Sequence, residues 1–133
     1  MKLVLLVTGA SGSIYARRAL HVLAAVRAGT WPGAPARPEL RVDWVASATA
    51  PQVWQHELGE AMPPQIDGLR RWERMDFGAP FASGSNAPDA VIVMPCSMSA
   101  LSRVAHGGGD DLPARACEVA LKERRRLILV VRE

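Results

Sequence analysis

Residues 3–13 read LVLLVTGASGS, and this stretch decides the fold class. Its first part, Leu3 to Val7, is a continuous apolar run with the length and composition of a strand that is buried on both faces. Small polar residues end the run, and from Ile14 the apolar residues recur at intervals of three and four until Gly29. The pattern predicts a buried strand, a short turn and an amphipathic helix, which together form the first half of a βαβ unit.

The same alternation continues along the chain. Further strands are predicted at residues 40–46, 90–94 and 127–131, and further helices at about 51–58, 99–105 and 113–123. Prolines and glycines interrupt every pattern in residues 59–89, where we expect one short strand or helix near residues 69–75. The sequence therefore predicts a single domain over residues 1–133 with an α/β fold: a flavodoxin- or Rossmann-like three-layer sandwich with a mostly parallel sheet.

Composition excludes several classes of protein. The chain has 133 residues, of which 49% are hydrophobic and 22% are charged, so it is neither a disordered tail, nor a fibre, nor a disulfide scaffold. No apolar run approaches the roughly 20 residues that a membrane span needs. The net charge of +3 does not by itself indicate nucleic acid binding, and it is compatible with a small ligand that carries phosphate. We expect neither a membrane nor a nucleic acid as partner.

The two cysteines, Cys96 and Cys117, cannot build a disulfide framework or a metal cage by themselves. Both lie in apolar or amphipathic stretches, which favours buried thiols in a reducing compartment. The three histidines show no metal-binding spacing. We therefore expect a cytoplasmic protein without a metal site.

Three loops of small polar residues follow predicted strands: residues 8–13, residues 47–49 and residues 95–99. Arg132 follows the last strand. Ligands of open parallel sheets bind outside the carboxyl ends of the strands, so these loops predict one binding site. The first loop leads into a helix, whose free N–H groups favour a phosphate. The alternative for this loop alone is a tight turn with a serine that caps the helix.

Known phosphate-binding signatures do not fit the first loop. The dinucleotide fingerprint G-x-G-x-x-G would need glycine where Ser11 and Ile14 stand, and the later glycines of short-chain dehydrogenases are also missing. A P-loop would need Gly-Lys-Ser or Gly-Lys-Thr, which is absent. The residues by themselves indicate a phosphate site without a dinucleotide signature.

Four blocks taken together resemble the UbiX-type flavin prenyltransferases. They are GASGSIYA at residues 9–16, ASGS at 82–85, MPCSM at 94–98, and LKERR at 121–125 with VRE at 131–133. The resemblance implies a flavodoxin-like fold related to the flavin-binding cysteine decarboxylases, and FMN as cofactor. It also implies transfer of a dimethylallyl group from dimethylallyl phosphate to N5 and then C6 of reduced FMN. The product, prenylated FMN, serves a UbiD-type decarboxylase.

The resemblance further implies roles for individual residues. Ser11 and Glu57 would be catalytic, Ser11 close to flavin N5 and Glu57 as a group that moves a proton if burial raises its pKa. Arg132 would reach the FMN phosphate. The residues implied to bind FMN are Gly9, Ala10, Ser11, Ser47, Ser97, Met98, Ser99, Ala100 and Arg132. The alternatives are a solvated charge for Glu57 and a solvent-exposed chain end for Arg132.

The chain departs from the family in several places. Ser99, Asp111 and Arg126 stand where lysine, asparagine and proline are common, and family chains continue beyond the point that corresponds to Glu133. That further part carries residues that hold dimethylallyl phosphate and part of the interface of a homo-oligomer. Two alternatives follow: an FMN-binding module without catalysis, and an enzyme like the flavin-dependent cysteine decarboxylases, in which His56 would have to serve as base.

Overall fold

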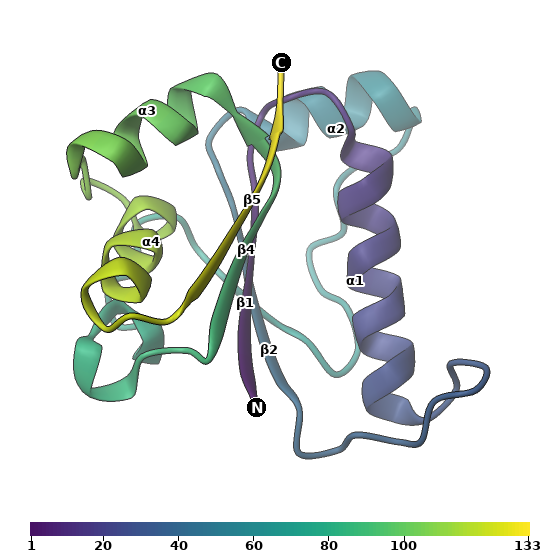
Figure 1. Ribbon diagram of the computed structural model, residues 1–133. Coiled ribbons are helices and arrows are strands. Elements are labelled where there is room, and N and C mark those ends of the chain that lie inside the picture. The colour runs from purple at the N-terminus through teal and green to yellow at the C-terminus, as the bar shows by residue number, and fades with distance from the viewer.

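The computed structural model describes residues 1–133 and contains one five-stranded sheet in which all paired strands are parallel (Figure 1). The strand order is β3-β2-β1-β4-β5. The strands are β1 (Lys2–Val7), β2 (Arg41–Ala46), β3 (Arg70–Trp72), β4 (Ala90–Ser97) and β5 (Arg126–Arg132). The helices are α1 (Ser13–Ala28), α2 (Ala50–Leu58), α3 (Met98–His106) and α4 (Leu112–Lys122), with short 3-10 turns η1 (Pro80–Ala82) and η2 (Gly84–Asn86).

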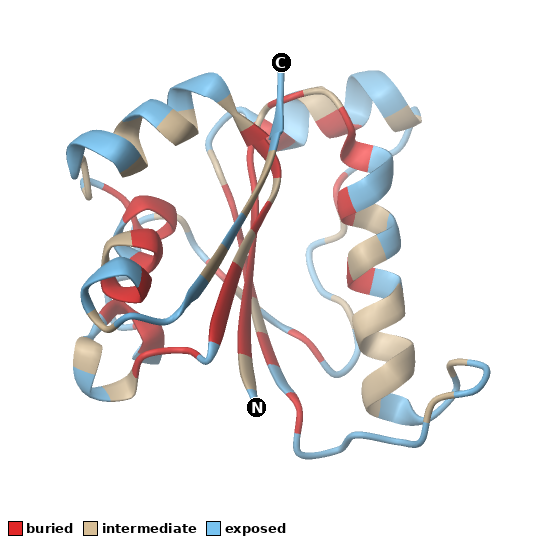
Figure 2. Cartoon of the chain, viewed as in Figure 1, coloured by how far each residue is buried: buried red, intermediate tan, exposed pale blue.

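Helices cover both faces of the sheet, as Figure 1 shows: α1 lies on one side, and α3 and α4 lie on the other. The predicted three-layer α/β fold is confirmed, and the sheet is wholly rather than mostly parallel. The side chains of β1 alternate between the two faces of the sheet. Leu3 and Leu5 pack in the core beneath α1, whereas Val4 and Leu6 pack in the core beneath α4. This double burial, visible along the centre of Figure 2, explains why the strand is apolar at every position.

The helix predicted to run from Ile14 to Gly29 is confirmed as α1. It ends where the sequence predicts because Gly29 adopts a left-handed conformation (φ 77°) and its N–H bonds to carbonyl oxygens of the last turn. A side chain at this position would also press on the following loop, since a Cβ atom would lie 2.6 Å from the Cβ of Ala36.

Two segments differ from the prediction. β4 does not stop at Met94 but continues to Ser97, because the strand shifts register after Val93 and then pairs again with β5. Proline lacks an N–H group, so Pro95 interrupts the ladder without ending the strand. In residues 59–89 the expected short element is the strand β3, while η1 and η2 have no apolar periodicity and are absent from the prediction.

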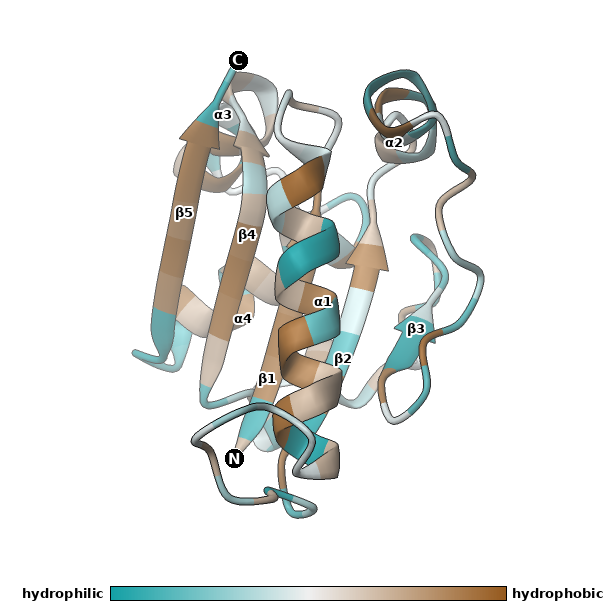
Figure 3. Cartoon of the chain, turned by 90° about the vertical axis from the view of Figure 1, so that its right-hand side faces the viewer, coloured by the Kyte–Doolittle hydropathy of each residue, from teal (hydrophilic) through white to brown (hydrophobic).

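The edge strand β5 is less buried than the rest of the sheet. Ile128 and Val131 are 41% and 45% exposed, and Figure 3 shows apolar residues along β4 and β5 beside α1. Both cysteines are buried and unpaired, as predicted. No helix of the chain combines the length and the apolar character that a bilayer crossing requires.

Candidate functional site

The loops after β1, β2 and β4 meet around a cleft of about 390 Å³ at the carboxyl edge of the sheet. The chain proceeds from β1 to β2 on one side of the sheet and later adds β4 on the other side of β1. Ligands of such sheets bind at this reversal of strand order, so we call the hollow the switch-point cleft. Five of the predicted site residues line it: Gly9, Ser47, Ser97, Ser99 and Ala100.

Thr8 fastens the first of these loops to the end of β4. Its buried hydroxyl donates a hydrogen bond to the carbonyl oxygen of Pro95 (2.7 Å) and accepts one from the N–H of Ser97 (2.9 Å). Thr8 and Ser97 both line the cleft. Thr8 therefore sets the separation of two of the loops.

Gly9 allows the first and second loops to approach each other. A Cβ atom on Gly9 would lie 2.8 Å from the Cβ of Thr49 and 3.2 Å from its carbonyl carbon. Any larger residue would push the loop after β2 away from the cleft. The glycine that begins the sequence motif is thus needed for close packing of the cleft wall.

Ser47 presents an unpaired polar group. Its backbone N–H donates to the carbonyl oxygen of Val7 (2.8 Å), which ties it to β1. Its hydroxyl, however, is buried and has no hydrogen-bond partner. A buried hydroxyl without a partner is unfavourable, and a ligand in the cleft would supply the missing hydrogen bond.

Ser97 has a structural task of its own. It is the N-cap of α3, and its hydroxyl accepts a hydrogen bond from the N–H of Ala100 (3.2 Å). The first N–H groups of a helix have no acceptor within the helix, so the start of α3 beside the cleft suits an anion. Met98 is exposed and Ala10 is buried, and neither lines the cleft.

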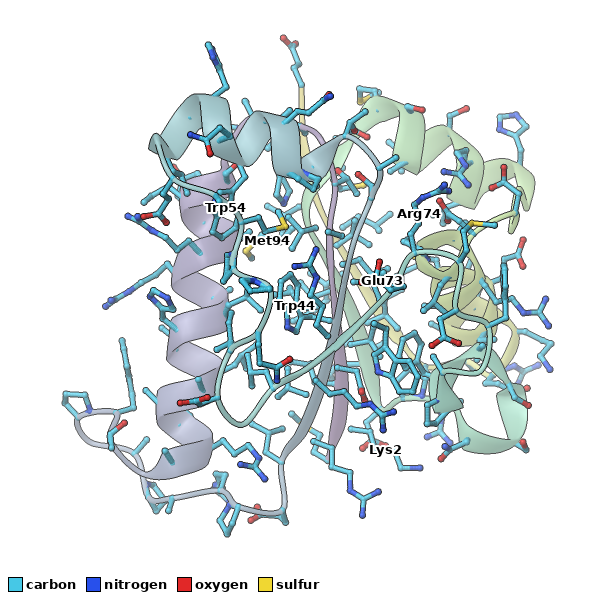
Figure 4. The ribbon with its side chains drawn as sticks, turned by 180° about the vertical axis from the view of Figure 1, so that it is seen from behind. Lys2, Trp44, Trp54, Glu73, Arg74 and Met94 are labelled. Atoms are coloured by element: carbon cyan, nitrogen blue, oxygen red, sulfur yellow. The ribbon has the colours of Figure 1, made fainter.

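Two arginines and one aspartate form the far wall of the cleft. The guanidinium groups of Arg74 and Arg103 lie 3.5 Å and 3.3 Å from one carboxylate oxygen of Asp111, and Arg103 also pairs with Asp110. The other oxygen of the buried Asp111 accepts the N–H of Ala114 (3.0 Å) and caps α4. Figure 4 shows Arg74 between α3 and α4. Asp110 and Asp111 balance the charges of Arg74 and Arg103, so this wall offers an anionic ligand the guanidinium N–H groups that the ion pairs leave free rather than an excess of positive charge.

The start of α1 forms a second polar group of residues, which we call the α1 cluster: Ser11, Gly12, Ser13, Glu57 and Arg132. The carboxylate of Glu57 accepts hydrogen bonds from the N–H of Gly12 (3.0 Å to each oxygen) and of Ser13 (2.7 Å). These are the N–H groups that the sequence predicts would bind a phosphate. A carboxylate from α2 occupies them, because it provides the same negative charge at the helix start.

The pKa of Glu57 moves in the direction opposite to the prediction. Desolvation by itself raises this pKa. The hydrogen bonds from Ser13 and Gly12 and the positive charge of Arg132 lower it by a larger total amount, so the pKa lies below the ordinary 4.5. The condition under which Glu57 was expected to move a proton, a pKa raised by burial, is therefore not met. The physical reason is that the N–H groups of Gly12 and Ser13 stabilise the charged carboxylate, and together with Arg132 they outweigh the desolvation that opposes it.

Arg132 is the last residue of β5 and not a residue beyond it. Its guanidinium donates to the hydroxyl of Ser11 (3.3 Å) and lies 5.9 Å from the ring centre of Tyr15. The N–H of Ser11 donates to the carbonyl oxygen of Glu133 (2.7 Å). The end of β5 is thereby joined to the first loop, on the α1 side of the switch-point cleft.

Comparison with known proteins identifies the family of the chain. The profile of a family described as Flavoprotein matches residues 1–132. The chain belongs to the flavoprotein family. Flavin prenyltransferase UbiX of Methanocaldococcus jannaschii is 41% identical to this flavoprotein over 135 residues, which cover 100% of the chain and 66% of that protein. The chain thus spans about two thirds of the length of this curated relative, and the predicted resemblance to UbiX-type proteins is confirmed.

Two solved structures share the fold of the flavoprotein at more than 30% identity. A crystal structure of AnUbiX in complex with FMN and dimethylallyl pyrophosphate has a TM-score of 0.78 and 34% identity, covering 99% of this chain and 64% of that one. A dodecameric FMN-dependent UbiX-like decarboxylase from Escherichia coli has a TM-score of 0.79 and 33% identity, covering 100% and 67%.

Sequence reasoning did not name as site residues five polar residues of the cleft: Thr8, Thr49, Arg74, Arg103 and Asp111. Thr8 and Thr49 lie within the predicted loops, so their neighbours could have indicated them. Arg103 follows Ser99 by one helical turn, which places both on one side of α3. Arg74 lies in the segment without a readable pattern, and no signal in the flavoprotein sequence identifies it.

Proposed function

We propose that this flavoprotein binds FMN and that the FMN phosphate occupies the switch-point cleft. The unpaired hydroxyl of Ser47 carries the proposal, because a phosphate oxygen would accept the hydrogen bond that this buried group lacks. The start of α3 and the guanidinium groups of Arg74 and Arg103 offer further hydrogen-bond donors. Gly9 keeps the loop after β2, with Ser47, close to the first loop.

The contact between Ser11 and Arg132 bears on the orientation of the cofactor. The hydroxyl of Ser11 and the guanidinium of Arg132 are 3.3 Å apart, so both face the same part of a bound ligand. The ring and the phosphate of FMN lie at opposite ends of its ribityl chain. If Ser11 lies near flavin N5, as the family resemblance implies, Arg132 belongs to the ring end as well. Arg74 and Arg103 are then better placed than Arg132 to hold the phosphate.

We further propose that the protein takes part in transferring a dimethylallyl group from dimethylallyl phosphate to N5 and C6 of reduced FMN, and that the prenylated FMN serves a UbiD-type decarboxylase. Bound reduced FMN supplies the nucleophilic ring. Ser11 would orient this ring through its hydroxyl. Glu57, whose lowered pKa keeps it ionised, is suited to stabilise positive charge rather than to accept a proton, and the nearby charge of Arg132 contributes to that lowering.

The length of the chain favours a second candidate function. Because the chain spans 66% of the UbiX relative, an FMN-binding module without transferase activity fits the same cleft. The third alternative, an enzyme like the cysteine decarboxylases, needs His56 as a base. His56 is exposed on α2 and lines none of the cleft, so nothing in the geometry supports that reaction.

We also propose that the protein forms a homo-oligomer and lies in the cytoplasm. The exposed apolar residues of β5 and the dodecameric UbiX-like structure support a homo-oligomer. Two unpaired buried cysteines are compatible with the reducing cytoplasm.

Quenching of flavin fluorescence during titration with the purified chain tests FMN binding. We expect Ser47→Ala to weaken binding by about 1 kcal/mol and Arg103→Gln by about 1–3 kcal/mol. Arg125→Gln, an exposed charge before β5, is the control and should change nothing. Absence of FMN binding by the unmodified chain, or equal affinity of all variants, would contradict the cleft assignment.

Mass spectrometry then separates the two candidates. The chain is mixed with reduced FMN and dimethylallyl phosphate, and the flavin is analysed for the gain of one dimethylallyl group. A gain supports the transferase, whereas bound FMN without a gain supports the module.

A further inference from the structure

A second cleft of about 390 Å³ lies at the amino edge of the sheet, on the opposite side from the switch-point cleft. Figure 4 shows Lys2 at this end of the sheet and Arg74 toward the other. We call it the amino-edge cleft. Its lining comes from β1, β2, β3, the last turn of α1, and η1 and η2 with the residues that follow them. None of these residues takes part in the proposed binding of FMN.

The amino-edge cleft gathers positive charge. Its cationic residues are Lys2, Arg27, Arg41 and Arg70. Lys2, Arg41 and Arg70 are the first residues of the neighbouring strands β1, β2 and β3, and Lys2 and Arg41 are direct partners in the register. Like charges at directly opposed positions destabilise a sheet unless an opposite charge lies between them. The topology therefore brings three cations to one edge at an energetic cost.

The charges of this cleft are only partly balanced within the chain, since Asp43 is the direct register partner of Arg70 in the sheet. None of the four cationic residues forms an ion pair. The only carboxylate in the lining belongs to Asp43, and it accepts a hydrogen bond from the indole N–H of Trp72 (2.7 Å). Four cations against one carboxylate leave a net charge of +3 in a single hollow. An anion from solution would neutralise this excess.

Three of the four cations are held in position by uncharged partners. The Nε of Arg27 donates to the carbonyl oxygen of Leu40 (3.1 Å), and the ammonium of Lys2 donates to the side-chain oxygen of Asn86. The guanidinium of Arg70 stacks on the ring of Trp72, 3.8 Å from its centre. These contacts leave other N–H groups of each cation free to bind a ligand. Because the side chains are already ordered, little conformational entropy is lost when an anion binds.

The floor of the cleft is apolar. Val4, Val42, Leu69, Phe81 and Pro88 are buried beneath the cations. A cleft of several hundred Å³ with an apolar floor and a few charged groups has the dimensions of a small-molecule site. Guanidinium groups recognise phosphate oxygens better than single carboxylates because their planar N–H groups can form paired hydrogen bonds.

From this geometry we propose that the amino-edge cleft binds a small molecule with at least two phosphate charges, such as inorganic pyrophosphate or the diphosphate of an organic ester. The site is separate from the FMN cleft and does not depend on the proposed function. The apolar floor gives an organic diphosphate contacts that pyrophosphate lacks.

Amide chemical shifts of the ¹⁵N-labelled full chain locate the binding site. Inorganic pyrophosphate and adenosine diphosphate are titrated separately, with sulfate as the control for general ionic strength. We expect saturable shifts of the amides of residues 68–70 and 86, at lower concentration for either phosphate compound than for sulfate. Tighter binding of adenosine diphosphate than of pyrophosphate assigns the ligand to organic esters, and the reverse order assigns it to the inorganic ion.

The variant Arg41→Gln/Arg70→Gln should weaken the binding about tenfold or more, because two charge-assisted contacts are removed. The matched variant Arg17→Gln/Arg18→Gln removes the same charge from the outer side of α1 and should leave the affinity unchanged. Both variants replace partly or fully exposed side chains, and thermal unfolding confirms that they are folded. Shifts confined to residues 9, 47 and 97, equal binding of sulfate, or equal weakening by both variants would each overturn the proposal.

Discussion

The switch-point cleft and the α1 cluster both include the loop after β1, but they differ in whether their polar groups have hydrogen-bond partners. In the α1 cluster the N–H groups of the helix start are bonded to the carboxylate of Glu57. In the cleft the hydroxyl of Ser47 has no partner at all. A glycine-rich turn before a helix is therefore not sufficient evidence of a phosphate site. In this loop cluster the unpaired hydroxyl of Ser47, which lines the cleft, indicates the site better than the motif does.

The largest expected loss of stability concerns Asp111 in the far wall of the switch-point cleft. Asp111→Ala removes the buried carboxylate between Arg74 and Arg103 and also the cap of α4, and we expect a loss of about 2–3 kcal/mol in the free energy of unfolding. Urea denaturation measures it. The matched variant Asp111→Asn keeps an oxygen that can cap the helix and should lose less. Equal losses in both variants would show that the charge, not the cap, determines stability here.

A pair of serine variants sharpens the contrast between satisfied and unsatisfied groups. Ser97→Ala removes the N-cap of α3 and should lower the free energy of unfolding by about 1 kcal/mol. Ser47→Ala removes a hydroxyl without a partner, so the ligand-free protein should be equally stable or slightly more stable. Thermal unfolding without ligand compares the two. A clear destabilisation by Ser47→Ala would mean that this hydroxyl already has a partner in the protein.

The smallest effect concerns Glu57 and depends on pH. Its pKa in the folded protein lies below the ordinary 4.5, so its stabilising contribution is present above about pH 4.5 and disappears as the pH falls through the folded pKa. We expect Glu57→Gln to cost less than about 1 kcal/mol at pH 7, because the side chain is exposed. The difference from the unmodified protein should vanish in acid.

Denaturation at a series of pH values, with Glu60→Gln as the control, measures this dependence. Glu60 forms only an exposed ion pair with Arg17 (3.2 Å) and should show a smaller loss at pH 7. A loss for Glu57→Gln that grows as the pH falls would contradict the direction of the pKa shift.

Features that depend on local sequence patterns could be predicted, whereas features that depend on specific contacts between distant segments could not. Leu3 to Val7 could be identified as a doubly buried strand because its apolar pattern is local. The carboxyl ends of parallel strands share one edge, so the meeting of the three loops was also predictable. The extension of β4 past Met94 was not predictable, because it depends on pairing with β5 and not on the local effect of Pro95.

The sequence by itself determined the order of strands and helices, the end of α1 at Gly29 and the family, since each follows from residues that are neighbours along the chain. Only the tertiary structure decided that Glu57 fills the start of α1, that Arg74 and Arg103 converge on Asp111, and that three strands begin with cations around one cleft. Such contacts join residues that are far apart along the chain: 45 positions for Gly12 and Glu57, and 121 positions for Ser11 and Arg132. Their existence depends on distances of a few ångströms between side chains, which no local pattern encodes.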